Sequence, residues 1–132
     1  LTFLFLQRGT PCIYYGTELA LKGGPDPDCR RVMPWDRVSE DNDMLNFMKK
    51  LIQVRKEISN IIQYGTYKLE EVKPDILSLK WSYEGKEVQA IFNQSEENFV
   101  LDRDSVDLAS HCQFEDGQQV ILPNGFVVYM ID

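Results

Sequence analysis

The first fifteen residues pass from an apolar helix-like pattern through helix breakers to a second short apolar run. Leu1 to Gln7 has neither a capping residue nor a polar lead-in, which predicts the last turns of a helix. Gly9 stands where a helix often stops in the left-handed conformation, and Pro11 keeps the helix from resuming. Cys12 to Tyr15 is too short for a helix and is typical of a strand buried on both faces, as in parallel sheets.

A long connection without periodicity follows, from Gly16 to Asn42. Its helix and strand breakers are Gly23, Gly24, Pro25, Pro27 and Pro34. A connection of this length in a compact domain usually carries a function. In β/α folds the loops after the strands build the ligand site. Helix, turn, strand and loop therefore predict half of a β/α repeat, with the loop as the candidate site.

The next stretch has the three- and four-residue spacing of an amphipathic helix. Its apolar face is formed by Met44, Phe47, Met48, Leu51, Ile52 and Ile58. Asp41, Asn42 and Asp43 offer side-chain oxygens that can cap its start. The pattern predicts a helix from Met44 to Ser59.

From Gly65 the hydrophobic period changes to two. The predicted strands are Thr66 to Val72, Ile76 to Tyr83, Glu87 to Asn93, Asn98 to Leu101, Val106 to Ser110, Gln118 to Leu122 and Phe126 to Ile131. Turn-forming residues separate several of them, at 73–75, 84–86, 115–117 and 123–125. This alternation predicts an all-β antiparallel sandwich. The helix leads directly into it, so we expect two regions, 1–62 and 63–132.

Composition and charge narrow the partners. In 132 residues, 43% are hydrophobic and 27% are charged, which indicates a folded protein. The net charge is −7 and no run of Lys or Arg exceeds two, so a nucleic acid or an anionic membrane is not an expected partner. An acidic balance suits neutral substrates, although it also serves solubility alone.

Cysteine usage and the chain's start bear on compartment and completeness. Three widely spaced cysteines argue against a disulfide framework and favour a reducing, cytoplasmic location. A zinc site from Cys12, Cys29, His111 and Cys112 is disfavoured because no C-x-x-C pair is present. Leu1 to Leu6 is too short to span a bilayer. Because the chain begins with Leu inside a helix-like pattern, we expect it to be part of something longer.

The loop from Asp26 to Asp36 gathers the residues with most chemical potential. Its charged and aromatic members are Asp26, Asp28, Arg30, Arg31, Trp35 and Asp36. Carboxylates and guanidinium groups can bind sugar hydroxyls, and an indole face can stack on a pyranose ring. The same set fits a structural ion-pair knot. A glycosidase pair of Glu18 with Asp26 or Asp28 is disfavoured, because these acids all follow one strand, whereas catalytic acids of barrel enzymes follow several.

Two motifs resemble the α-amylase family of glycoside hydrolases. Gly9-Thr-Pro-Cys-Ile-Tyr-Tyr-Gly-Thr-Glu18 is similar to the last barrel strand of the family and its exit. Gly24-Pro-Asp-Pro-Asp-Cys-Arg-Arg-Val-Met-Pro-Trp-Asp36 resembles the following loop in its neopullulanase, cyclomaltodextrinase and maltogenic amylase branch. Downstream, Leu51 to Arg55 resembles the final barrel helix, and Gly65 onward the C-terminal β domain. The resemblance implies the final β/α unit of a (β/α)8 barrel followed by the sandwich.

The resemblance also implies roles for individual residues. Asp26 and Arg30 match positions that contact glucose units on the non-reducing side of the cleaved bond. Asp28 and Arg31 match positions that hold the loop in shape, and Trp35 is expected to pack beneath it. Glu18 matches a residue that supports the strand exit. The family's catalytic Asp, Glu and second Asp follow earlier barrel strands, so no catalytic residue is expected in this chain.

The expected function is therefore that of a C-terminal portion of an intracellular α-glucan hydrolase. Its parent would cleave α-1,4 bonds in oligosaccharides or cyclodextrins by the retaining route, and this chain alone would be inactive. No cofactor or metal is expected here, and calcium in the rest of the parent is left open. Alternatives are a stand-alone glycan-binding or structural module and a transglycosylase or α-glucosidase parent. Apolar faces expected to meet the barrel could make the chain self-associate.

Two positions depart from the family pattern. Many relatives have Asp where this chain has Thr17, and Gly23-Gly24-Pro25 lengthens or stiffens the start of the loop. The second departure leaves the path of that loop open.

Overall fold

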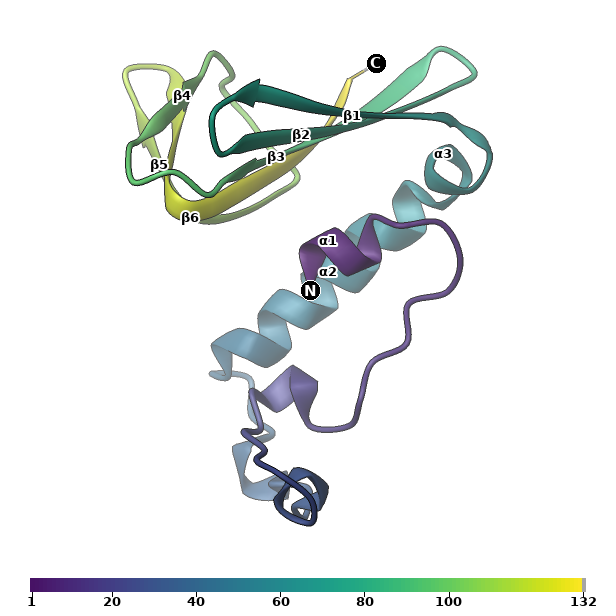
Figure 1. Ribbon diagram of the computed structural model, residues 1–132, viewed down its shortest axis with the longest axis vertical. Coiled ribbons are helices and arrows are strands. Elements are labelled where there is room, and N and C mark those ends of the chain that lie inside the picture. The colour runs from purple at the N-terminus through teal and green to yellow at the C-terminus, as the bar shows by residue number, and fades with distance from the viewer. Residues whose placement is uncertain (132) are drawn as a thin grey trace. The chain divides into compact units, whose positions relative to one another are not determined.

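The computed structural model describes residues 1–131 and divides the chain into two compact units, Leu1–Arg55 and Lys56–Asp132. The predicted boundary at residue 62 falls inside the second unit. Figure 1 shows the elements along the chain. The helices are α1 (Thr2–Phe5), η1 (Thr17–Leu19), η2 (Asp28–Arg30), η3 (Trp35–Arg37), α2 (Asp43–Glu57) and α3 (Ser59–Tyr64). The strands are β1 (Thr66–Lys73), β2 (Ile76–Tyr83), β3 (Lys86–Asn93), β4 (Phe99–Leu101), β5 (Leu108–Glu115) and β6 (Gln118–Ile131).

The start of the chain is a short helix tied to α2. α1 ends at Phe5, two residues before the predicted end at Gln7, while Gly9 takes the expected left-handed conformation, with φ at 93°. The Arg55 guanidinium donates hydrogen bonds from Nη2 to the carbonyl oxygens of Gln7, at 3.3 Å, and Gly9, at 3.0 Å. These carbonyls follow the end of α1, where the helix itself supplies no donors. Arg55 thus anchors the segment after α1 to α2.

The predicted strand from Cys12 to Tyr15 is wrong for this chain. These residues run in an irregular path, and Cys12, Tyr14 and Tyr15 are exposed. A strand exists only where a neighbouring strand pairs with it, and every paired strand in residues 1–131 lies between Thr66 and Ile131. An apolar run that suits a buried strand therefore stays unpaired here.

The predicted helix over 44–59 is confirmed in its main part and corrected at its end. The Asn42 side-chain oxygen accepts a hydrogen bond from the Leu45 N–H at 2.9 Å and so caps α2. Buried Met48, Leu51 and Val54 form one stripe along α2. The helix breaks at Ile58, where φ is −93° and ψ is 7°, and continues as α3. The break is not visible in the periodicity, because the apolar residues continue through it.

The strands form one antiparallel sheet rather than the predicted sandwich. Its six strands follow the order β1-β2-β3-β6-β4, with β5 on the other edge of β6. β3 pairs with the second half of β6, and β4 with the first half. The alternation in β2 is confirmed on one face, where Leu79 and Trp81 are almost fully buried, but Ser78 on the other face is buried as well. The prediction failed in assuming that two separate sheets would form.

The single sheet follows from the path of β6 through Pro123-Asn124-Gly125. These residues were expected to reverse the chain between two strands, but β6 runs through them and β5 accompanies both halves. Figure 1 shows this long strand bending along the sheet. On β5 the register shifts at His111, which has φ of 51°, and Asn124 has φ of 61°. Paired irregularities bend the two strands together, so the sheet curls without dividing.

A hydrophobic cluster fills one face of the curled sheet. Its buried members are Ile76, Ile91, Ile121, Val127 and Tyr129, with Phe99, Leu101, Val106, Cys112 and Ile131 packed against them. α3 packs on β2 and β3. The second unit therefore has a core of its own.

Candidate functional site

The candidate site is the loop from Gly24 to Asp36, in the first unit. The chain approaches it through Gly16, whose φ of 81° is a left-handed conformation that favours glycine. A Cβ at Gly16 would lie 2.7 Å from the side chain of Leu21. η1 follows directly and carries Glu18, which is half-buried. Among residues 1–131, no group donates a hydrogen bond to the Glu18 carboxylate and no cation pairs with it. The supporting role of Glu18 therefore stays a prediction.

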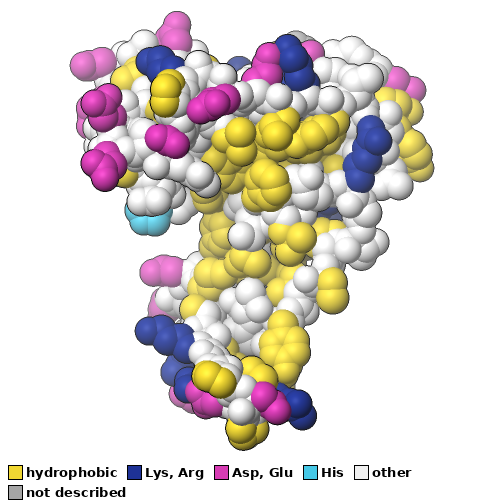
Figure 2. Space-filling view, viewed as in Figure 1, with side chains coloured by type: hydrophobic (Ala, Val, Ile, Leu, Met, Phe, Trp, Pro, Cys, Tyr) yellow, Lys and Arg dark blue, Asp and Glu magenta, His cyan; other side chains and the backbone are white. Residues whose placement is uncertain are grey.

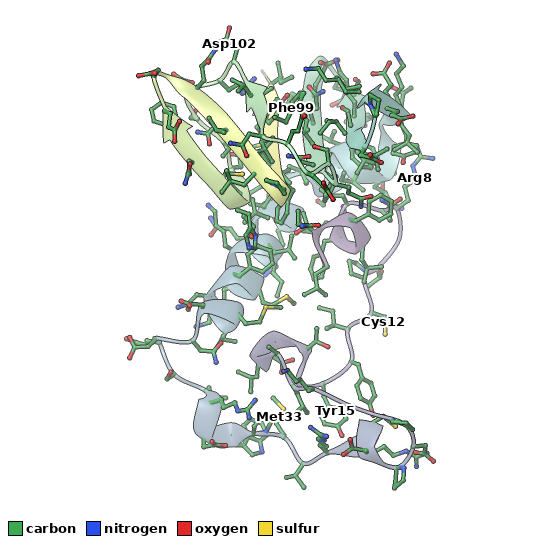
Figure 3. All side chains as sticks on the ribbon, turned by 60° about the vertical axis from the view of Figure 1, so that its left-hand side comes forward. Arg8, Cys12, Tyr15, Met33, Phe99 and Asp102 are labelled. Atoms are coloured by element: carbon green, nitrogen blue, oxygen red, sulfur yellow. The ribbon has the colours of Figure 1, made fainter. Side chains whose placement is uncertain are left out.

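A bidentate ion pair organises the turn at η2. Arg31 donates from Nε to Asp28 Oδ1 at 2.7 Å and from Nη2 to Oδ2 at 2.6 Å. Gly24 makes room for this carboxylate, because a Cβ there would lie 2.6 Å from Asp28 Oδ2. The Tyr15 hydroxyl donates a hydrogen bond to the Arg31 carbonyl oxygen at 2.7 Å, and Figure 3 shows Tyr15 beside the loop. Asp28 and Arg31 are thus joined in the way that loop-supporting residues would be.

The two residues expected to contact sugar lie next to each other on the same turn. Arg30 Nη2 is 3.0 Å from Asp26 Oδ1, and both side chains are largely exposed, at 69% and 64%. The Cys29 thiol also lies 3.6 Å from Asp26 Oδ1. Asp26 Oδ2 and the remaining guanidinium N–H groups of Arg30 have no partner among the described residues. The pair therefore presents free acceptor and donor atoms to solvent.

Electrostatics separate the two ion pairs. The hydrogen bonds from Arg31 hold the pKa of Asp28 below its usual value, and the pKa of Arg31 is raised by the same contact. Both groups therefore stay charged across the neutral range. Around it, Figure 2 shows acidic and basic side chains next to exposed apolar ones.

The expectation that Trp35 packs beneath the loop is not met in this chain. Trp35 begins η3 and is 72% exposed, and Val32 is 87% exposed. Hydrogen bonds and ion pairs hold the loop, among them the contact from Tyr15, and Trp35 adds no buried packing to it. Asp36 is likewise exposed on η3.

Sequence reasoning missed two supports of the loop, Tyr15 and Gly24. Tyr15 was assigned to a buried strand, and its hydroxyl contact with residue 31 spans a separation that no local pattern reveals. The Gly23-Gly24-Pro25 run was interpreted as a helix and strand breaker and as a departure from the family pattern, not as space for a carboxylate. Its second glycine leaves space for the Asp28 carboxylate.

The chain matches no protein-family model. It is 42% identical over 96 residues to the intracellular maltogenic amylase of Bacillus subtilis (strain 168), a match that covers 71% of this chain and 16% of that protein. It is 36% identical over 101 residues to a cyclomaltodextrinase of Thermoanaerobacter pseudethanolicus, covering 76% and 17%. Its fold aligns with a crystal structure of the maltogenic amylase from S. marinus at a TM-score of 0.72 and 31% identity, covering 96% and 18%.

The chain belongs to the α-amylase family. Within this family it falls in the maltogenic amylase, cyclomaltodextrinase and neopullulanase branch, where it corresponds to a C-terminal portion of longer proteins. It spans only 16% and 17% of the two curated relatives described. The resemblance found in its two motifs is thereby confirmed.

The candidate site of this α-amylase-family chain gains no further residues from its cysteines or from possible metal ligands. Cys12, Cys29 and Cys112 are free thiols. Across residues 1–131 there is no group of three or more His, Cys, Asp or Glu side chains arranged to hold a metal ion. None of the helices in the same range is both long and apolar enough to cross a membrane.

Proposed function

We propose that this chain is the C-terminal part of an intracellular, cytoplasmic α-glucan hydrolase that cleaves α-1,4 bonds in oligosaccharides or cyclodextrins. The unit Leu1–Arg55 would be the final β/α unit of a (β/α)8 barrel, with Cys12 to Tyr15 paired to neighbouring barrel strands. The curled sheet would be the C-terminal β domain. The kinship with enzymes named maltogenic amylase and cyclomaltodextrinase supports this proposal.

The carrying observation is the exposed Asp26–Arg30 pair. The free Oδ2 of Asp26 would accept a hydrogen bond from one sugar hydroxyl, and the guanidinium of Arg30 would donate to another. Because the two charges compensate each other, the pair adds no net charge against a neutral ligand. Such charge-assisted hydrogen bonds are about twice as strong as those between neutral groups.

The chemistry would reside in other parts of the parent. In the retaining route one carboxylate forms a glycosyl-enzyme, while a second carboxyl group protonates the leaving oxygen and then activates water. Glu18, Asp26 and Asp28 all follow one segment and would not supply that pair. We therefore expect the 132-residue chain alone to lack hydrolytic activity.

Substitutions of the sugar-contacting pair test the proposal in the protein made from the complete reading frame. Asp26→Ala and Arg30→Ala should each lower kcat/KM on cyclomaltoheptaose by about 10- to 100-fold, since a hydrogen bond to a charged group contributes about 1.5–3 kcal/mol. Arg37→Ala is the matched control, because Arg37 is an exposed arginine of the same connection. Its kcat/KM should stay near that of the unaltered protein.

Equal losses for all three variants would refute a specific role for Asp26 and Arg30, and so would no loss in any of them. Analysis of the products separates the candidate parents. Linear maltooligosaccharides alone indicate hydrolysis, whereas longer transfer products would indicate a transglycosylase.

A further inference from the structure

β1 lies at the edge of the sheet and is exposed along its whole length. Within residues 1–131 it pairs with β2 only, and all its residues from Thr66 to Lys73 are exposed. Two apolar side chains on one of its faces remain open, with Tyr67 at 43% and Leu69 at 51% exposure. An uncovered edge of this kind is a template for pairing with another strand.

The hairpin register shows which backbone groups of β1 are free. Tyr83 and Lys86 close the two-residue turn between β2 and β3, and such a closing pair exchanges both of its backbone hydrogen bonds. Alternation along β2 then directs the backbone groups of Lys80 toward its β1 partner Lys68. The next residue, Leu69, therefore directs its N–H and C=O outward, into the open edge.

The charges beside Leu69 are complementary to a copy of themselves. Lys68 and Glu70 flank Leu69 on the other face of the strand and form an ion pair with each other, with side chains 68% and 45% exposed. In an antiparallel pairing of two β1 strands centred on Leu69, Lys68 stands opposite Glu70 of the second copy. Lysine on an edge strand normally prevents pairing, but here each lysine would meet a glutamate.

We propose that two copies of this chain associate edge to edge through β1, with the two-fold axis at Leu69. The two Leu69 residues would exchange backbone hydrogen bonds, and Tyr67 of each copy would pair with Glu71 of the other. The sheets of both copies would then form one continuous sheet. This proposal is independent of the proposed function.

Register is specified by charge and by face. A shift of the two-fold axis by one residue along β1 places Lys68 opposite Lys68 or Glu70 opposite Glu70, which is destabilising. An axis midway between two residues of β1 would instead place the apolar face of one strand beside the charged face of the other. Among arrangements shifted by up to one residue, the one centred on Leu69 avoids both faults. Since one strand edge buries less than a standard interface, we expect a weak, reversible dimer.

Sedimentation of the 132-residue chain over a range of concentrations tests the proposal. The weight-average mass should rise from 15.3 kDa toward twice that value. Lys68→Glu and Glu70→Lys should each raise the dissociation constant about tenfold or more, because each places like charges opposite one another. The double exchange K68E/E70K should restore it, because the opposite charges are again paired.

Leu69→Pro separates edge pairing from other modes of association. Proline removes the outward N–H of Leu69, which makes no bond within the sheet, so the fold should persist by circular dichroism while the dimer is lost. A chain that remains monomeric, or one whose association is unchanged by L69P or by the single charge reversals, would overturn the proposal. Association through α1 or α2 would give the latter result.

Discussion

At the scale of single residues, the candidate loop is shaped by one carboxylate. Asp28 accepts two hydrogen bonds from Arg31 and occupies the space that Gly24 leaves open. This arrangement holds the backbone turn that brings Asp26 and Arg30 together. The predicted sugar-binding residues thus depend on neighbours that would not themselves touch the sugar.

This dependence predicts how the loop responds to pH. The pKa of Asp28 is lowered in the folded loop, chiefly by the hydrogen bonds from Arg31. Its stabilising contribution is therefore fully present above the ordinary carboxyl pKa and is lost as the pH falls through the lowered value. We expect residues around η2 to become more mobile in that acidic range, as measured by nuclear magnetic resonance relaxation.

A matched pair of variants assigns the shift to its cause. Arg31→Ala should raise the pKa of the Asp28 carboxyl toward its ordinary value in a carboxyl-detected titration, whereas Arg30→Ala should leave it lowered. If both variants behaved alike, the bidentate pair would not be the cause.

At the scale of elements, hydrophobic periodicity correctly predicted the helix and strand whose positions are set by local sequence. β2 was predicted with its observed bounds, Ile76–Tyr83, because its apolar residues alternate and turn residues flank it. The body of α2 followed from its apolar stripe and from Asn42. The wrong predictions concern strands that depend on a pairing partner. Cys12 to Tyr15 has no partner strand within residues 1–131, and β6 continues through 123–125, with β5 paired to it on both sides of those residues.

Local sequence likewise predicted only part of the candidate site. Asp26 and Arg30 are four residues apart on one turn, so their proximity follows from local sequence. The support from Tyr15 comes from a distant segment and could not be predicted from spacing. The exposure of Trp35 also depends on what surrounds the loop, which composition does not show.

The bend of β5 and β6 requires a residue without a side chain at Gly125. A Cβ at Gly125 would clash with the carbonyl oxygen of His111 and would lie 2.8 Å from that of Leu122. Because these are backbone atoms, they cannot move aside cheaply. Gly125→Ala should lower the free energy of unfolding by about 3 kcal/mol, the upper end for overpacking.

Gly117 supplies the control for that substitution. It has a left-handed φ of 81°, but nothing lies within 4 Å of a Cβ placed there. Gly117→Ala should cost only about 1 kcal/mol of backbone strain. Urea unfolding monitored by the fluorescence of buried Trp81 measures both; a smaller loss for Gly125→Ala than for Gly117→Ala would contradict the close approach of β5 and β6.

At the scale of the whole molecule, the chain combines a loop-rich first unit with a second unit built on its own core. The first unit, Leu1–Arg55, carries the candidate sugar site. Within it, Arg55 of α2 holds the segment that follows α1. The second unit has a continuous sheet and a hydrophobic cluster. Under the proposed function, the first unit would supply a sugar-binding loop, and the second a β domain, to an enzyme that acts on α-glucans.

The central proposal is that this chain contributes a sugar-binding loop to an α-glucan hydrolase whose catalytic carboxylates lie elsewhere. Incubation of cyclomaltoheptaose with the product of the complete reading frame, and in parallel with the 132-residue chain, tests it most directly. The account predicts linear maltooligosaccharides from the complete product and none from the chain. Ring opening by the chain alone, or no ring opening by a folded complete product, would contradict it.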